Sequence, residues 1–312
     1  MNGNGETDVT RAPSLASRRR LAVRRFAQKV DRPIFFALGL VSLVALGVIF
    51  VFVVREAIPV FRYVSPFSLL GPAWHPTSEP PLFGALPMIA ATGLVTLGAL
   101  VLAIPLGFAS AGFVAEIAPP ALRDLAKSLL ELLAAIPSVV YGLFGLTVVA
   151  PFVQRTFNLP TGQNGLSASL ILALMALPTV ASLAEDALTA VPKAHREASL
   201  ALGASRWQTT WRVVFPSAFS GLFGAAVLGM GRAVGETMAV LMVAGNSPVL
   251  TWSFLRPVRT LTAGIALEMA EAPSGSAHYH ALFMLGAILL LLALATNGLA
   301  EWFRGRVARQ GE

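Results

Sequence analysis

Residues 191–216 read VPKAHREASLALGASRWQTTWRVVFP and separate two long apolar runs. Glu197, Leu200 and Ala201 recur at helical spacing in this stretch. Gly203 can end that helix or let a second helix pack close to it. The stretch therefore predicts a short helix, a turn and a second amphipathic segment that project out of the membrane. The alternative is an amphipathic helix that lies on the membrane surface.

The rest of the chain is too apolar for a water-soluble globule. Of its 312 residues 55% are apolar and only 12% are charged, and the mean hydropathy is +0.71. Soluble domains are about 25% charged, so this composition argues for lipid as the solvent and against a soluble enzyme. The net charge is +7, but the chain lacks the dense basic patches on a polar body that are typical of a nucleic-acid binder. We therefore expect no nucleic-acid partner. The absence of cysteine excludes disulfides and cysteine-bound metals.

Six apolar runs are long enough to cross a bilayer, whose hydrocarbon core of about 30 Å needs about 20 residues per helix. They predict an all-α membrane protein with six transmembrane helices in one domain of residues 31–305. The runs lie at about 34–54, 86–114, 128–153, 166–188, 217–244 and 281–303.

The Lys and Arg residues between these runs predict the orientation. Seventeen of them fall on one side of the membrane and five on the other, and the richer side is cytoplasmic by the positive-inside rule. Both termini and the stretch 191–216 are then cytoplasmic, in a multi-pass protein of the cell membrane. The basic tail of residues 1–30 has no apolar period, so we expect it to be irregular and to lie along anionic lipid. Residues 306–312 form a second short tail.

The loops on the opposite side leave alternatives open. The loop at about residues 55–81 is rich in proline and aromatic residues, which suits an ordered cap or a contact for an external partner. Arg256 and Arg259 could guide an anion, contact such a partner or be ordinary surface charges. His278 and His280 lack convergent carboxylates, and we assign them no metal site.

Arg232 and Glu236 lie in the middle of the fifth run. A charge at the bilayer centre costs about 2.5–3.5 kcal/mol, so both must face the bundle interior or a water-filled path. Four residues apart on one helix, they share a face and can pair. Arg232 could be a fixed cation that binds an oxyanion on a translocation route, with Glu236 orienting it. The alternative is a buried ion pair that locks one helix to another.

Ser138 and Tyr141 follow Pro137 in the third run. Proline frees a backbone carbonyl, and the two hydroxyl groups could line a path through the membrane. A kink needed only for packing explains the same residues, so both interpretations stay open.

The chain lacks the residues that would make it an enzyme. A phosphate-binding P-loop needs glycine directly before lysine, but Lys29, Lys127 and Lys193 follow Gln, Ala and Pro. No nucleophile and base are paired, and no cofactor or metal is expected. Any ATP that drives this protein must be hydrolysed by another subunit.

The stretch 191–216 resembles the EAA loop of ABC-importer permeases, whose pattern is Glu-Ala-Ala, three residues, Gly, nine residues and Ile-x-Leu-Pro. Four positions keep that spacing: Glu197, Ala198, Gly203 and Pro216. Three depart from it: Ser199, Val213 and Phe215. The resemblance implies the type I ABC-importer permease fold with a cytoplasmic coupling helix that docks on a separate ATPase subunit. Glu197, Ala198 and Gly203 would be coupling residues, with Arg206 and Trp207 as further contacts.

Three more segments resemble the permeases of the phosphate-specific ABC importer, and its C-type member most. They are residues 136–145, residues 231–238 and residues 260–266 with Glu268. The resemblance implies that Arg232 and Glu236 act in phosphate translocation. It also implies a homologous A-type permease, two ATPase copies and an external phosphate-binding protein as partners.

Two other functions remain open at this point. The chain could be an importer permease for another oxyanion, such as sulfate or molybdate. It could also be an ion-coupled secondary transporter in which Glu236 binds the proton.

Overall fold

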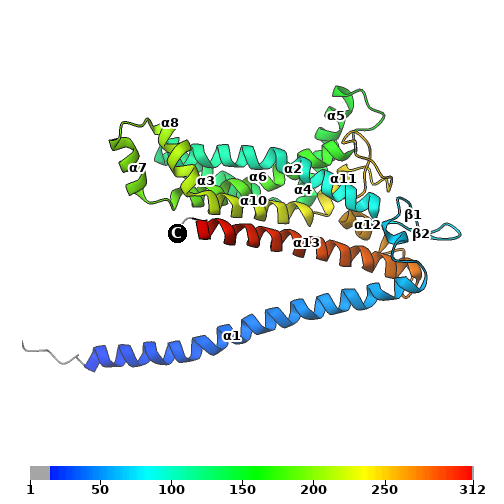
Figure 1. Ribbon diagram of the computed structural model, residues 1–312, viewed down its shortest axis with the longest axis horizontal. Coiled ribbons are helices and arrows are strands. Elements are labelled where there is room, and N and C mark those ends of the chain that lie inside the picture. Colours follow the sequence, from blue (N-terminus) through cyan, green and yellow to red (C-terminus); the bar gives the residue numbers. More distant parts are fainter. Residues whose placement is uncertain (1–14, 311–312) are drawn as a thin grey trace, which may run out of the picture. The chain divides into compact units, whose positions relative to one another are not determined.

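The computed structural model describes residues 15–310, and all but four of the residues in its regular elements are helical (Figure 1). The chain divides into two units, residues 1–52 and residues 53–312. In the described part of the first unit there is only helix α1, which runs from Leu15 to Ala57 and continues into the second unit.

Helix α1 corrects the expectation of an irregular tail. It begins at Leu15, so the prediction is wrong for residues 15–30, whereas residues 1–14 and 311–312 lie outside the described part. Leu, Ala, Arg, Gln and Lys dominate residues 15–30, and all of them favour helix. Absence of an apolar period therefore did not mean absence of helix.

In the second unit the end of α1 is followed by two short 3-10 turns and a two-stranded antiparallel hairpin, and the other regular elements are helices. The turns and strands are η1 (Ile58–Arg62), η2 (Ser68–Leu70), β1 (Trp74–His75) and β2 (Leu82–Phe83). The first helices are α2 (Leu86–Gly112), the π-helix η3 (Phe113–Ile117), α3 (Pro120–Ala135), α4 (Ser138–Phe144), the π-helix η4 (Gly145–Val149), α5 (Ala150–Thr156) and α6 (Gly165–Thr189).

The remaining helices start with the short ones at one end of this unit. They are α7 (Lys193–Ala201), α8 (Arg206–Thr209), the π-helix η5 (Thr210–Val214), α9 (Phe215–Ser217), α10 (Phe219–Val234), α11 (Met238–Val243), α12 (Leu261–Glu268) and α13 (Ala277–Gln310).

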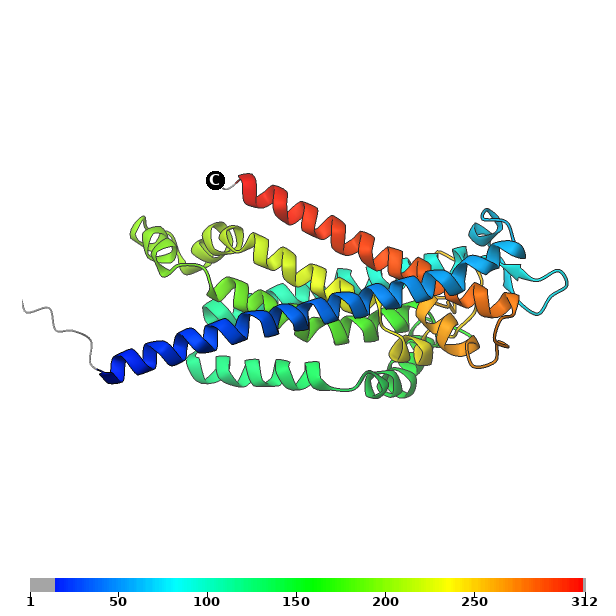
Figure 2. The ribbon, with the colours of Figure 1, turned by 90° about the horizontal axis from the view of Figure 1, so that it is seen from below.

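Helices α2, α6 and α10 run side by side through the middle of the second unit (Figures 1 and 2). Helix α3 packs on α6, and α13 packs on α10. Helices α7 and α8 lie at one end of this bundle, and the β-hairpin and α12 lie at the other (Figure 1). We call these the α7–α8 end and the hairpin end.

Val180 of α6 sets the spacing of the three central helices. The side chain is fully buried between Gly107 of α2 and Gly229 of α10. A Cβ atom at Gly107 would lie 2.8 Å from Val180 Cγ1, and one at Gly229 would overlap Val180 Cγ2. Each methyl group therefore occupies the space that a missing side chain leaves, and small residues of this kind let membrane helices approach closely.

Five helices in the described part of the chain are long and apolar enough to cross a membrane. The number is six when the pair Arg206–Ser217 and Phe219–Val234, bent by 71°, counts as one span. The predicted third run at 128–153 starts too early, because the chain breaks before Pro137 and the apolar span is Ser138–Thr156. The predicted fifth run is not continuous, because α10 ends at Val234 and α11 begins at Met238.

The hairpin end is an ordered cap. Trp74 and Phe83 face each other across the hairpin and are buried with Leu261 of α12 and Leu282 of α13. The loop that was expected to form a cap or an external contact therefore has a packed core of its own, and the hairpin ties it to the ends of α12 and α13.

The Val180 packing generates a prediction in which one substitution has opposite effects at two glycines of α10. Gly229→Ala places a Cβ against the buried, stiff Val180, so we expect a loss of about 1–3 kcal/mol and a lower melting temperature of the purified protein. Gly224→Ala meets no atom within 4 Å and should stabilise the helix by about 0.5–1 kcal/mol. Equal shifts for both variants in thermal unfolding would contradict the role of Val180.

Candidate functional site

Arg232 lies in the last turn of α10 and contacts two other helices. Its Nη1 atom donates to Thr179 Oγ1 of α6 at 3.1 Å, and its Nη2 atom donates to the Ala134 carbonyl of α3 at 3.4 Å. Both acceptors are neutral. The other N–H groups of the partly buried guanidinium have no acceptor within the described residues.

The Ala134 carbonyl is free for Arg232 because the chain breaks between α3 and α4. In a continuous helix the carbonyls of Leu133 and Ala134 would accept from residues 137 and 138. Pro137 has no N–H group, and the extended backbone at Ile136 turns the chain before Ser138. Leu133 O accepts from Ile136 N at 3.3 Å and from the Tyr141 hydroxyl at 2.9 Å.

Arg232 and Tyr141 thus meet at the same helix break. Tyr141 is buried, whereas Ser138 is partly buried and its hydroxyl makes no hydrogen bond within the described residues. The structure therefore brings together three of the four predicted translocation residues, Arg232, Tyr141 and Ser138, around the junction of α3 and α4.

Glu236 lies in a second break, between α10 and α11. Its Oε1 atom accepts from the backbone N–H of Ala239 at 3.2 Å, which caps the start of α11. Its carbonyl accepts from Thr262 Oγ1 of α12 at 2.8 Å. The expectation that Arg232 and Glu236 share one helix face is wrong, because the helix that would carry both ends at Val234.

No ion pair joins Arg232 with any carboxylate in the part of the chain that the structure describes. The proposed helix-locking pair with Glu236 is therefore absent there. Since a hydroxyl and a carbonyl are its only partners among the described residues, no carboxylate there offsets the charge of this guanidinium, and its remaining N–H donors match an oxyanion. This arrangement can bind an anion inside the bundle.

The α7–α8 end presents a different surface. Helix α7 ends at Ala201, and Gly203 follows two residues later with a left-handed φ of +85°. Gly203 N donates to Leu200 O at 2.9 Å and Ala204 N donates to Ser199 O at 3.2 Å, the hydrogen-bond pattern of a Schellman motif. Helix α8 then starts with a capping box between Ser205 and Gln208. The predicted helix, turn and second segment are confirmed.

All five residues assigned to ATPase contact are exposed on this surface: Glu197, Ala198, Gly203, Arg206 and Trp207. Trp207 is 63% exposed, and the neighbouring Leu202 is 90% exposed. Large apolar side chains at a turn, with charged residues beside them, are typical of a surface that binds another protein.

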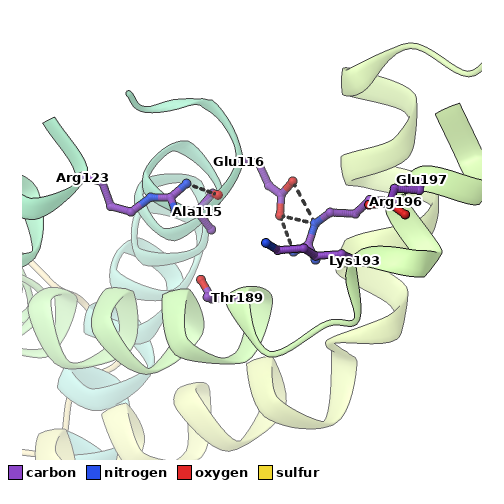
Figure 3. Close-up of a pocket in the computed structure, with 7 residues that line it drawn as sticks. All are labelled: Ala115, Glu116, Arg123, Thr189, Lys193, Arg196 and Glu197. Carbon is purple, nitrogen blue, oxygen red and sulfur yellow. Dashed lines mark hydrogen bonds and ion pairs between the residues drawn. The ribbon is translucent and has the colours of Figure 1, made fainter. Parts of the chain in front are cut away.

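Beneath this surface lies a pocket of about 350 Å³ between the end of α2 and the start of α7 (Figure 3). Its lining residues come from η3, α3, α6 and α7, and they are Ala115, Glu116, Arg123, Thr189, Lys193, Arg196 and Glu197. Arg196 points across the pocket to Glu116, and the two form an ion pair of 2.7 Å (Figure 3). Residue spacing did not predict this contact, because Glu116 and Arg196 are 80 positions apart.

The hairpin end holds a partly buried polar cluster around Glu268. Its carboxylate forms an ion pair with Arg259 and accepts from Trp74 Nε1 at 2.9 Å. His278 Nε2 lies 2.8 Å from the same carboxylate. The side chain of Arg259 is only 15% exposed, so the interpretation of Arg259 as an ordinary surface charge is wrong. His278 joins this cluster, and the described residues include no group of three His, Asp or Glu that could hold a metal.

The comparisons with known proteins agree with this fold. Residues 103–309 match the family described as the binding-protein-dependent transport system inner membrane component. The probable ABC transporter permease protein YqgH of Bacillus subtilis is 40% identical over 273 residues, which cover 86% of this chain and 88% of that protein. The phosphate transport system permease protein PstC of Mesorhizobium japonicum is 35% identical and covers 96% of this chain and 97% of that protein.

Solved structures of ABC importers share the fold at lower identity. A bacterial alginate ABC transporter in complex with its periplasmic protein has a TM-score of 0.60 at 15% identity, over 91% of this chain and 98% of that one. The methionine ABC transporter MetNI has a TM-score of 0.56 at 20% identity, over 74% of this chain and 99% of that one.

The chain belongs to the family of binding-protein-dependent transport system inner membrane components. It is an all-helical, multi-pass inner membrane permease of an ABC importer with the type I fold, and it is not itself an enzyme. Membership of this family implies that an ATPase and a binding protein are its partners.

The Schellman turn at Gly203 generates a prediction about local stability. A β-branched side chain is strained at φ +85° by about 1–2 kcal/mol, so Gly203→Val should open the end of α7. We expect the backbone amides at positions 203 and 204 to exchange hydrogen faster in Gly203→Val than in the wild type. Gly203→Asn is the matched control, because asparagine tolerates this conformation. Equal protection in both variants would contradict the role of this turn.

Proposed function

We propose that this permease carries inorganic phosphate into the cytoplasm, driven by ATP hydrolysis on a separate subunit. The observation that supports phosphate most directly is Arg232, a cation inside the bundle with a hydroxyl and a carbonyl as its partners and no carboxylate. A fixed cation of this kind favours an oxyanion. The PstC proteins, named as phosphate transport permeases, are 33–36% identical to this chain.

Arg232, Tyr141 and Ser138 would line the path, each from its place at the α3–α4 break. Arg232 would bind phosphate through its free N–H donors. Glu236 would act one helix break away, where its carboxylate holds the start of α11 and repels a second anion. A single permease supplies one wall of such a path, and a homologous A-type permease would supply the other.

The α7–α8 end would face the cytoplasm, with both termini on the same side. This orientation rests on the seventeen Lys and Arg residues of the segments on that side. Glu197, Ala198, Gly203, Arg206 and Trp207 would then dock on one of two ATPase copies. The permease domain would comprise residues 31–305, and the hairpin end would face an external phosphate-binding protein.

The test of this function is uptake by the assembled complex in proteoliposomes. We expect external phosphate to accumulate only with internal ATP, and excess sulfate or molybdate to leave the rate unchanged. An ATPase subunit that cannot hydrolyse ATP should abolish uptake. Preferred uptake of another oxyanion would contradict the proposed cargo, and uptake driven by a proton gradient without ATP would favour a secondary transporter.

The role of Arg232 generates a separate prediction. Arg232→Gln removes the charge but keeps a side chain that can hydrogen-bond to Thr179, so we expect assembly to persist. Phosphate uptake should fall by about 100-fold, which corresponds to about 2.7 kcal/mol, while ATP hydrolysis continues. Arg155→Gln is the control, because Arg155 is exposed and its guanidinium makes no hydrogen bond within the described residues. Loss of assembly in Arg232→Gln would favour a purely structural role.

A further inference from the structure

At the α7–α8 end, one turn of the chain contacts the three helices α3, α6 and α7. This is the π-helix η3, residues Phe113–Ile117, which follows α2. A π-helix leaves backbone carbonyls without the usual i→i−4 partners at its end, and charged side chains can bind them.

Arg196 of α7 makes the strongest of these contacts. Its Nη2 atom lies 2.7 Å from Glu116 Oε1, and its Nε atom lies 3.2 Å from the same oxygen. The pair is largely shielded from water, with side-chain exposures of 20% and 12%. The same guanidinium donates to the carbonyls of Leu188 and Val191 at 2.8 and 2.5 Å, where α6 ends.

Arg123 of α3 binds the same turn from another direction. Its Nε atom donates to Val114 O at 2.9 Å, and its Nη2 atom donates to Ala115 O at 2.6 Å. The two arginines therefore join α7, the end of α6 and the start of α3 to the end of α2 at one point (Figure 3).

Helix α3 connects this point with Arg232. It has 16 residues and spans about 24 Å at 1.5 Å per residue. Near its middle Lys127 binds Glu185 and Asp186 of α6 at 3.0 Å each, and hydrogen bonding with these carboxylates raises the pKa of Lys127. The amine therefore stays charged and holds α3 along α6. At the far end Ala134 O accepts from Arg232.

We propose that the Glu116–Arg196 ion pair is the joint through which movement of α7 reaches α2 and α3, and through α3 the Arg232 site. Glu116 and Arg196 are positioning residues, since neither touches the transported ion. The proposal rests on the proposed docking of an ATPase on α7 and α8. Without the joint, Arg196 still binds the end of α6 and Ser199 still contacts Thr209, but no hydrogen bond or ion pair of the described residues joins α7 directly to the turn after α2. Movement of α7 would then no longer be passed directly to that turn.

The experiment measures phosphate imported per ATP hydrolysed by the assembled complex. Glu116→Gln keeps the size of the side chain and leaves Arg196 bound to the Leu188 and Val191 carbonyls, but it removes the ion pair. We expect the ratio of phosphate to ATP to fall about tenfold, with ATP hydrolysis within about twofold of the wild type. Asp124→Asn is the matched control, because Asp124 is an exposed carboxylate on α3 that makes no ion pair with any side chain that the structure describes.

The absence of cysteine from the chain permits a second, independent test. In Glu116→Cys with Arg196→Cys, assembled with cysteine-free partners, a bifunctional thiol reagent about as long as the two lost side chains replaces the joint. We expect a low phosphate-to-ATP ratio before cross-linking and a ratio near the wild type after it. A merely structural ion pair would change thermal stability without this reversal.

Two results would overturn the proposal: a wild-type ratio in Glu116→Gln, or a ratio in the double cysteine variant that cross-linking does not raise. If the Glu116→Gln complex fails to assemble, the phosphate-to-ATP ratio of the cross-linked double cysteine variant tests the proposal. The proposed cargo fails separately, when the wild-type complex hydrolyses ATP and imports no phosphate. The same ratio is then measured with the competing oxyanion that the wild type imports.

Discussion

The packing of Val180 between Gly107 and Gly229 is the contact on which the rest of the bundle depends. Lipid is as apolar as a leucine side chain, so membrane helices associate through close packing and not through burial from water. Gly107 and Gly229 bring α2 and α10 close to α6, with one methyl group of Val180 in each gap. Thr179 directly precedes Val180, and Arg232 follows Gly229 by about one turn. The hydrogen bond between Thr179 and Arg232 therefore forms because the glycines set the distance between α6 and α10.

A second constraint acts where helices break. In lipid each backbone carbonyl needs a partner, and this chain supplies that partner from side chains with a further role. Tyr141 and Arg232 donate to the carbonyls of Leu133 and Ala134, which lose their helical partners at the break before α4. Arg123 binds the carbonyls of Val114 and Ala115 in the π-helix after α2. Arg123 and Arg232 thus both bind at places where a helix is interrupted, and there the backbone changes direction.

The sequence predicted some of these features and missed others for identifiable reasons. Local spacing predicted α7, the Gly203 turn and α8, because a cap and an amphipathic period involve residues within a few positions. Average hydropathy predicted a continuous fifth run, but it does not register that Gly235 and the Glu236 cap end one helix and begin another. The pairing of Arg232 with Glu236 was wrong for the same reason. The Glu268 cluster joins residues up to 194 positions apart, and no local pattern marks it.

By itself the sequence determined the class of protein, because hydropathy, charge asymmetry and the spacing of Glu197, Ala198, Gly203 and Pro216 are properties of neighbouring residues. It also identified Arg232 as a charge in the middle of an apolar run, where insertion into a membrane is unfavourable unless the side chain faces the bundle interior or water. Only the tertiary structure decided the partners of that charge, the joint between Glu116 and Arg196, and the position of Arg259 beside Glu268. The physical reason is that an ion pair or hydrogen bond requires two groups within about 3 Å. That distance depends on where helices break and how closely they pack.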